Sequence, residues 1–507
     1  MSRNPNPPRK HTGLFIFLFI LIALFIAGSA LMIKLCLDLT TSEPQASERP
    51  GISTSIELPT LAATEPTTEP TEPDPVPESV VATATIGATG DLLMHEPVIT
   101  SGRQSDGTYN FGSIFQYLKE YASAVDFATA NLETTLFGPG KPYKGYPMFN
   151  CPDEIVTSAI DAGMDMLLTG NNHSFDTGME GYLRTIDVVR EAGIPNLGTM
   201  KDENDPKWLI QDINGIKVGM INYTYETSSG TGEYPSLNGL PMYGATYENV
   251  NCFRMDAPEP FLEEVKGYLA EMKEAGAEAT ILFIHWGIEY NLKQNSQQSV
   301  IAQGLCDLGI DVIIGGHPHV VQPMDLLTST TDPDHKTVIL YSMGNAVSNQ
   351  RLGNLQSVST AHTEDGVFMT VTFEKYSDGK VYLVGTDILP TWVNLRYPST
   401  GREYAIIPLD YDRVDEWGTA FAMDEGTVNS AKNSYARTMA IVEEGLTACQ
   451  NYLAENKTAR EEYYYNLAWH PEMFETEPTE APEAPVDAGA EEVPYEEVPE
   501  ETLAPAA

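Results

Sequence analysis

Residues 315–319 read Gly-Gly-His-Pro-His and directly follow a mostly apolar run at residues 310–314. The run has the length and the β-branched content of a buried strand. Gly315 and Gly316, which follow the run, let the backbone turn tightly at the strand's end and come close to a bound group. His317 and His319 are thereby placed at the carboxyl end of a strand, where open α/β sheets bind their ligands. For this motif alone, a turn with two solvated imidazoles is an equally simple interpretation.

Polar side chains follow six strand-like apolar runs, and five of the nine histidines lie just after such runs. The clusters are Asp91 with His95, Asn131 with Glu133, Asn172 with His173, His285, His317 with His319, and Asn345. Imidazole and carboxylate ligands with an amide oxygen suit a divalent transition metal such as Zn, Mn or Fe. The set is large enough for two ions, and a pair about 3.5–4 Å apart can activate water and clamp a phosphoryl group.

Strand-like and helical segments alternate between residues 82 and 386, which predicts a largely parallel α/β sheet. Residues 208–213 and 217–223 are expected to form a hairpin around Asn214-Gly215, a strong turn signal. The long polar segment at residues 226–257 is interpreted as a loop insertion near the site. Helices are expected at residues 111–121, 153–162, 179–192, 260–275, 297–308 and 428–456.

In their order along the chain, these motifs resemble the CapA-type poly-gamma-glutamate capsule-biosynthesis proteins, whose domain is related to calcineurin-like metallophosphoesterases. The resemblance extends from about residue 84 to residue 350. It implies a metallophosphoesterase-like α/β/β/α sandwich that binds two divalent metal ions. The matching pieces are Gly90-Asp91, Asn131-Leu132-Glu133, and residues 171–178, 285–290, 316–323 and 341–345.

The same resemblance implies a role for each candidate residue. His173 would act as a general acid that protonates a leaving oxygen, with Asp176 as a second catalytic residue. Glu133 would bridge the two ions. The remaining metal ligands would be Asp91 and His319, with His95 assisting, for one ion, and Asn172, His285 and His317 for the other. The substrate-binding residues would be Glu289, Asn345 and Asn131.

Two residues depart from the metallophosphoesterase pattern. Leu93 stands where a histidine is usual, and His95 replaces it only if the strand continues or turns suitably. Glu133 stands where an Asp is usual, and its longer side chain would move the ions. Two alternatives also remain open at this point: Asp176 caps the following helix, and Glu289 is a solvated loop charge. A cluster without metal, in which Asn345 is a turn residue and Trp286 and Tyr290 are packing residues, is the simplest alternative to the site as a whole.

The N-terminal region predicts a membrane anchor. Residues 12–33 contain no charged side chain and span about 33 Å as a helix, enough to cross a bilayer core. Arg3, Arg9 and Lys10 precede this run, so the N-terminus is expected in the cytoplasm and the main domain outside the cell. The expected organisation is a cytoplasmic N-terminus (1–11), a transmembrane anchor (12–36), a Thr/Pro/Glu-rich linker (37–79), a CapA-like metallophosphoesterase-fold domain (80–400), a partly helical extension (401–470) and a disordered acidic tail (471–507).

The formal net charge of −43 excludes nucleic acid as a partner, because an acidic surface repels it. The five cysteines form no CxxC motif, so a cysteine zinc site is not expected. No GxSxG, GxxxxGK[ST] or HExxH motif is present, which removes support for serine hydrolases, P-loop enzymes and zincins.

Three functions are compatible with the resemblance, and the near-complete ligand set argues against one of them, a surface interaction protein whose old site is inert. The other two are as follows. The first is a dinuclear-metal hydrolase that acts on a phosphoester or a polymer linkage in envelope-polymer synthesis. The second is a non-catalytic subunit of a polymer synthesis or export complex that binds the anionic polymer beside other capsule synthase subunits.

Overall fold

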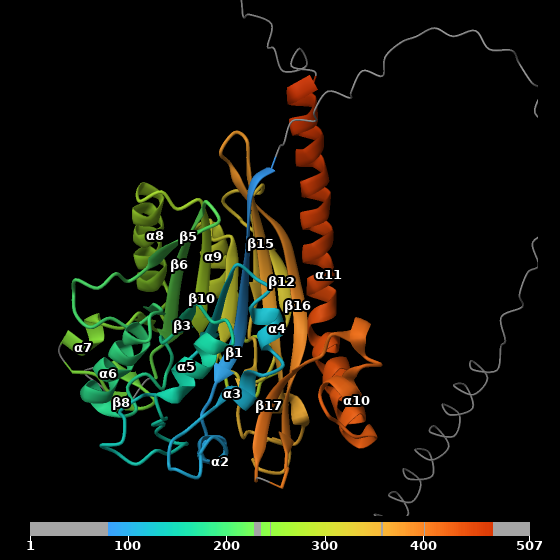
Figure 1. The fold of residues 1–507 in the computed structure, drawn as a ribbon. Helices are drawn as coiled ribbons and strands as arrows, with labels where there is room; N and C mark the ends of the chain where they lie inside the picture. Colours follow the sequence, from blue (N-terminus) through green and yellow to red (C-terminus); the bar gives the residue numbers. More distant parts are fainter. Residues whose placement is uncertain (1–79, 228–234, 244, 356–357, 400, 470–507) are drawn as a thin grey trace, which may run out of the picture. The chain divides into compact units, whose positions relative to one another are not determined.

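The computed structural model describes residues 80–227, 235–243, 245–355, 358–399 and 401–469. The expected anchor, linker and acidic tail lie outside these residues. Within the described part, no helix is both long and apolar enough to cross a bilayer. The described residues form two large sheets with helices on their outer faces (Figure 1).

The first sheet has eight strands in the order β17-β16-β15-β1-β2-β3-β4, with β14 paired to β1. Strands β1 to β4 are parallel, whereas β15, β16 and β17 are antiparallel to their neighbours. The bounds are β1 Val80–Leu92, β2 Phe127–Asn131, β3 Met166–Leu168, β4 Asn196–Leu197, β14 Asn345–Val347, β15 Asp365–Tyr376, β16 Val381–Arg396 and β17 Glu403–Pro408.

The second sheet has seven strands in the order β12-β13-β11-β10-β6-β5, with β9 paired to β6. Strands β6, β10, β11 and β13 run parallel, while β5 and β12 form antiparallel edges. The bounds are β5 Leu209–Ile213, β6 Ile216–Tyr225, β9 Cys252–Phe253, β10 Ala279–His285, β11 Val312–Gly316, β12 Met324–Thr328 and β13 Lys336–Leu340. A separate two-stranded hairpin joins β7 Ser236–Leu237 and β8 Leu240–Pro241.

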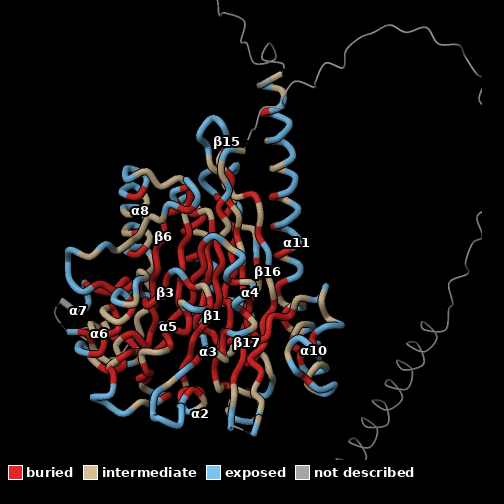
Figure 2. Tube along the Cα trace, in the orientation of Figure 1, coloured by how far each residue is buried: buried red, intermediate tan, exposed pale blue. Residues whose placement is uncertain are grey.

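Three apolar layers hold these elements together, and Figure 2 shows buried chain running through both sheets. Side chains such as Ile86, Met220 and Ile281 fill the space between the sheets. The outer face of the first sheet packs against short helices, and that of the second against α8 and α9. The helices are α2 Glu96–Ser101, α3 Gly112–Phe115, α4 Lys119–Ala122, α5 Glu154–Asp161, α6 Gly178–Glu191, α7 Ala245–Glu248, α8 Glu259–Glu274, α9 Ser296–Asp307, α10 Trp417–Ala420 and α11 Glu425–Trp469. The α/β class predicted from the sequence is therefore confirmed, and the layers run helix, sheet, sheet, helix.

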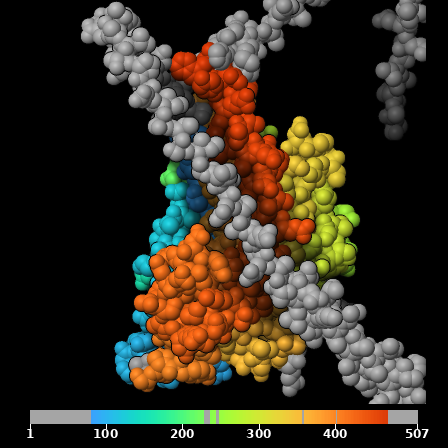
Figure 3. Space-filling model, turned by 90° about the vertical axis from the view of Figure 1, so that its right-hand side faces the viewer, coloured from blue at the N-terminus to red at the C-terminus, as the bar shows by residue number. Residues whose placement is uncertain are grey.

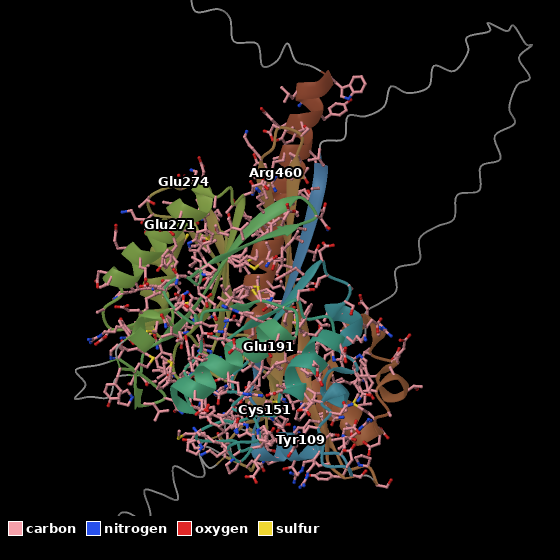
Figure 4. The ribbon with its side chains drawn as sticks, turned by 60° about the vertical axis from the view of Figure 1, so that its left-hand side comes forward. Tyr109, Cys151, Glu191, Glu271, Glu274 and Arg460 are labelled. Atoms are coloured by element: carbon pink, nitrogen blue, oxygen red, sulfur yellow. The ribbon has the colours of Figure 1, made fainter. Side chains whose placement is uncertain are left out.

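The long helix α11 contacts β16 of the first sheet and β12 of the second. Val442, Leu446 and Leu453 contribute to the core between the sheets. Figure 3 shows α11 on the face turned toward the viewer, above the segment that contains α10. Arg460, labelled in Figure 4, lies with its guanidinium 4.6 Å from the centre of the Tyr382 ring. The expected boundary at residue 400 separates strands that are hydrogen-bonded here, because β17 pairs with β16 along residues 391–408.

Local predictions succeed where turn chemistry is explicit. The hairpin at Asn214-Gly215 is confirmed, since both residues have positive φ, at 55° and 90°. The single helix predicted for residues 111–121 is wrong, because the segment divides into α3 and α4. The largely parallel sheet predicted from the alternation is in fact two sheets that both contain antiparallel strands, because the periodicity of buried strands does not reveal strand direction or sheet membership.

Candidate metal centre

The carboxyl ends of strands from both sheets converge on one cluster of buried polar side chains. In the first sheet, Asp91 of β1 lies in register with Asn131 of β2 and with Asn345 of β14. In the second sheet, His285 of β10 lies in register with Gly316 of β11. The parallel arrangement brings together residues that are far apart in the sequence, as expected for a site at strand ends.

Two groups of three side chains could each hold a metal ion, and Glu133 belongs to both. One group is Glu133, His285 and His317, and the other is Asp91, Glu133 and His319. In each group the candidate ligand atoms lie within 4.8 Å of one another, and all the residues are buried. A shared carboxylate between two ligand sets is the arrangement expected of a bridging residue.

Glu133 lies at the centre of this cluster. Its Oε1 atom is 3.4 Å from Nε2 of His285, 3.9 Å from Nε2 of His319 and 4.0 Å from Nε2 of His173. Both carboxylate oxygens are buried, and neither has a hydrogen-bond partner among the residues that the structure describes. The same holds for Nδ1 of His317, which is also buried.

Unpaired buried polar atoms are costly, so these three atoms indicate missing ligand contacts. Burial and the nearby Asp91 charge raise the pKa of Glu133 well above its usual value. Burial and the neighbouring His285 and His319 lower the pKa of His317 well below its usual value. A bound cation would favour the ionised carboxylate and the neutral imidazole, which are the forms that coordinate metals. The residues present therefore fit a divalent metal site.

Neighbouring amides and imidazoles fix the orientation of the candidate ligands. Nδ2 of Asn131 donates to Oδ1 of Asp91 at 2.7 Å, while Oδ2 of Asp91 lies 3.1 Å from Nδ1 of His319. Burial opposes ionisation of Asp91, but the contacts with His319, His285 and Asn131 produce a net lowering of its pKa. On the other side, Oδ1 of Asn172 lies 2.7 Å from Nε2 of His285. Glu133 lies near both His285 and His319 and so connects the two sides. Five of the predicted ligands thus form one network with Asn131: Asp91, Glu133, Asn172, His285 and His319.

The Gly-Gly-His-Pro-His motif has a steric explanation. A Cβ atom on Gly315 would lie 2.0 Å from the carbonyl oxygen of Tyr341, so no larger residue fits there. His317 and His319 both have positive φ, at 95° and 57°. Such backbone conformations are costly for residues other than glycine and are concentrated at functional sites. The turn directs both imidazoles into the cluster.

His173 and Asp176 form a buried pair beside Glu133. Nδ1 of His173 lies 2.8 Å from Oδ2 of Asp176. The same carboxylate accepts the backbone N–H of Phe149 at 2.6 Å and Nδ2 of Asn238 at 2.9 Å. Helix α6 has Thr177 at its N-cap and no side-chain cap, so Asp176 holds His173 and does not cap the helix.

His95 lies beside the cluster but belongs to neither ligand group. The chain leaves β1 at Leu92, and His95 precedes helix α2 with extended backbone angles. Its Nδ1 lies 3.3 Å from the carbonyl oxygen of Leu93 and 3.4 Å from the backbone N of Asn349. Burial is the main reason that its pKa is lowered to about 4. The assisting role of His95 in metal binding stays a prediction, without support from its placement.

The predicted substrate-binding residues occupy different depths. Glu289 is exposed, and its charge helps to raise the pKa of Glu133, while its role at the rim of the site stays a prediction. Asn345 is fully buried, and its Nδ2 donates to the backbone oxygens of His319 and Thr363. Asn131 is also buried and contacts Asp91. These contacts support positioning by both asparagines, while substrate contact stays a prediction. Trp286 is fully buried and stacks with Tyr341, so it packs.

Sequence reasoning missed Tyr225 and Asn238. The ring of Tyr225 lies 4.6 Å from that of His317, centre to centre. Asn238 and Gly239 form the turn of the β7–β8 hairpin with φ of 48° and 71°. The Asn-Gly pair was a recognisable turn signal inside the predicted insertion, but its contact with Asp176 depends on tertiary structure.

Comparisons with known proteins agree with the sequence motifs. A sequence model described as "Bacterial capsule synthesis protein PGA_cap" matches residues 85–350, slightly more than half of the chain. The match begins in β1 and ends just after β14, so it includes every residue of both ligand groups.

Three curated relatives have similar sequences. The "Capsule biosynthesis protein CapA" of Bacillus anthracis is 27% identical over 52% of this chain and 60% of its own length. The "PGA biosynthesis protein CapA" of Bacillus subtilis is 26% identical over 59% of this chain and 70% of its own length. The "Probable polyglutamine synthesis accessory protein Rv0574c" of Mycobacterium tuberculosis is 22% identical over 45% of this chain and 57% of its own length. The aligned part is thus 60% of the first relative and 70% of the second.

Proposed function

Because the chain belongs to the PGA_cap family of bacterial capsule synthesis proteins, we propose that it takes part in synthesis of an anionic capsule polymer as a metal-dependent hydrolase. The polymer class is suggested by the names of the CapA relatives, which refer to capsule and PGA biosynthesis. The observation that carries the proposal is the sharing of Glu133 between two buried ligand groups. The substrate bond would be a phosphoester or a linkage of the polymer itself.

Two divalent ions, Zn, Mn or Fe, would be held by the residues of this cluster. Asp91 and His319 would hold one ion, Asn172, His285 and His317 the other, and Glu133 would contact both. When bound, such ions supply Lewis-acid polarisation and a nucleophile derived from water. The helix–sheet–sheet–helix layers and the ligand set together support a metallophosphoesterase-like fold.

His173 would act as the general acid. Asp176 accepts a hydrogen bond from Nδ1 of His173, which fixes the orientation of the ring. Nε2 then faces the cluster, 4.0 Å from Oε1 of Glu133. An Nε2–H group would be positioned to protonate a leaving oxygen of a substrate bound at the metal centre.

In the proposed topology, residues 12–36 anchor the protein in the cell membrane and the main domain lies outside the cell. Its support is the charge-free apolar run preceded by Arg3, Arg9 and Lys10. A reporter fused after Ala82 should be active only outside the cytoplasm. Activity only inside the cytoplasm would contradict this topology.

The hydrolase proposal is tested by assaying the metal-loaded full-length protein on aryl phosphates and on poly-gamma-glutamate. We expect turnover of at least one substrate, with loss of turnover in His173→Ala. A second function is favoured by the name of the mycobacterial relative, a probable accessory protein of polyglutamine synthesis. If the protein binds metal and polymer but turns over neither substrate class, the non-catalytic subunit of a synthesis complex is the correct function.

A further inference from the structure

A pocket of about 670 Å³ has Asn349 in its wall, and the backbone N of Asn349 contacts Nδ1 of His95, the histidine next to the candidate metal centre. Its walls come from the segment after β14 and from the connection between β16 and β17. Its lining includes the side chains of Asn349, Arg351, Leu352, Asn354, Tyr397 and Arg402. We refer to it as the Arg402 pocket.

One stretch of chain links the metal centre to the pocket. Asn345, at the cluster, lies in register with Asp91, and Asn349 lies in the pocket wall four residues later. The backbone N of Asn349 contacts Nδ1 of His95 at 3.4 Å. The β16–β17 connection lies at the same end of the first sheet, because Trp392 of β16 is already in register with Asp365, where β15 begins. Figure 1 shows α2 at this end as well, and its Pro97 also lines the pocket.

The charge of the pocket differs from that of the chain. The protein has 72 acidic and 29 basic residues, yet the pocket lining contains two arginines and no carboxylate. Arg351 is held by Glu364 at 2.6 Å and by the carbonyl oxygen of Val393, so it is fixed and its charge is balanced. Arg402 is exposed, lies 6.0 Å from the centre of the Tyr397 ring, and has no ion-pair partner within the described residues. Its guanidinium is available to an anionic ligand.

The remaining walls match a chain that combines carboxylates, amides and methylene groups. Leu352 and Tyr397 are 55% and 70% exposed, which leaves apolar surface open inside a polar pocket. Asn354 lies in the same wall, where its Nδ2 donates to Oδ1 of Asn349, and that oxygen also accepts from the Tyr404 hydroxyl. Arginine recognises carboxylates through paired hydrogen bonds, and amide side chains can pair with the amide linkages of a peptide-like chain.

From this combination we propose that the Arg402 pocket binds a carboxylate-bearing, amide-linked chain and leads it toward the metal centre. This inference rests on the proposed function for the direction of the chain, but the pocket's binding can be measured independently of catalysis. Arg402 would contact a carboxylate, and Tyr397 and Leu352 would contact the methylene groups.

The test uses purified full-length protein and a fluorescent γ-linked oligoglutamate of defined length, with affinity measured by fluorescence anisotropy. Arg402→Gln should weaken binding about tenfold, which corresponds to one hydrogen bond to a charged group. Lys380→Gln is the matched control, because it removes one positive charge at the opposite end of the first sheet, where its partner is Asp378. It should leave the affinity unchanged. Arg402→Lys should recover part of the loss, since it restores the charge without the planar fork.

Several results would overturn the proposal. Failure of the wild-type protein to bind the oligomer would do so, as would equal affinities for wild type and Arg402→Gln. Equal binding of an oligoglutamine of the same length would show that carboxylates are not recognised. Tighter binding of a polyphosphate of matched charge would assign the pocket to a phosphate polymer. Metal content, measured on the same samples, tests the metal centre independently. The proposed function and the Arg402 pocket can therefore be contradicted separately.

Discussion

Nδ1 of His173 lies 2.8 Å from Oδ2 of Asp176, and this buried pair is adjacent to the shared carboxylate of Glu133. The distance is that of a hydrogen bond to a charged acceptor. Asp176 is itself held by the backbone of Phe149 and the side chain of Asn238. The pair is therefore oriented by two further groups, as a proton donor requires.

His173→Ala should keep the metal content near that of the wild type, because its proposed role is proton donation. If the protein is an enzyme, the rate should fall about 10²- to 10⁴-fold, the range for a positioned acid. His335→Ala is the control, since His335 contacts the backbone of Ile310 at the opposite end of the second sheet. Loss of metal in His173→Ala alone would instead identify His173 as a ligand.

Asn238→Gly should lower the turnover rate about tenfold, the equivalent of one lost hydrogen bond to a charged group. Glycine keeps the positive φ of this turn and removes the side-chain amide, which holds Asp176 and also donates to the carbonyl oxygen of Pro147. Asn214→Gly removes an asparagine of similar φ from a distant hairpin and should change nothing. Equal rates in both variants would show that Asn238 does not orient the pair.

The part of the site that could be predicted from sequence consists of residues at strand ends. Apolar runs followed by His, Asp, Asn or Glu identified the members of both ligand groups, because parallel strands carry such residues to one edge. His95 was placed less well, since the spacing did not show that the chain leaves β1 before it. Asn238 was missed because its role arises from contact between segments 62 residues apart.

The fold shows the same division. Asn214-Gly215 predicted its hairpin because the turn is encoded locally. The position of α11 was not predictable from the sequence. Its apolar residues show that one side of the helix is buried, but they do not identify its partners β12 and β16, which come from different sheets. The helix packs so closely on β12 that the residue at position 445 must be a glycine.

Gly445→Ala should destabilise the protein by about 1–3 kcal/mol, the usual cost of overpacking. A Cβ atom at this position would lie 1.8 Å from the carbonyl oxygen of Met324 in β12. Gly267→Ala in α8 is the matched control, because no atom lies within 4 Å of the added Cβ. It should stabilise the helix by roughly 0.5–1 kcal/mol. Denaturant unfolding measures both; an unchanged midpoint for Gly445→Ala would mean that α11 does not pack closely on β12.

Removal of metal should lower the melting temperature, because an ion that binds only the folded state stabilises it. A chelator should lower the melting temperature of the wild type more than that of Glu133→Gln, which has a weaker bridge. Thermal scans with and without chelator give the comparison. Equal shifts in the two proteins would show that Glu133 does not contribute to metal binding.

The most direct test of the central claim is the metal content of purified protein, measured by elemental analysis without chelator. The shared position of Glu133 predicts about two divalent ions per chain in the wild type, as in two-metal hydrolases. His317→Ala should lose one ion selectively, whereas Glu133→Gln should lose both together. A wild-type protein that binds no Zn, Mn or Fe, even after reconstitution, would contradict the account of a dinuclear metal centre.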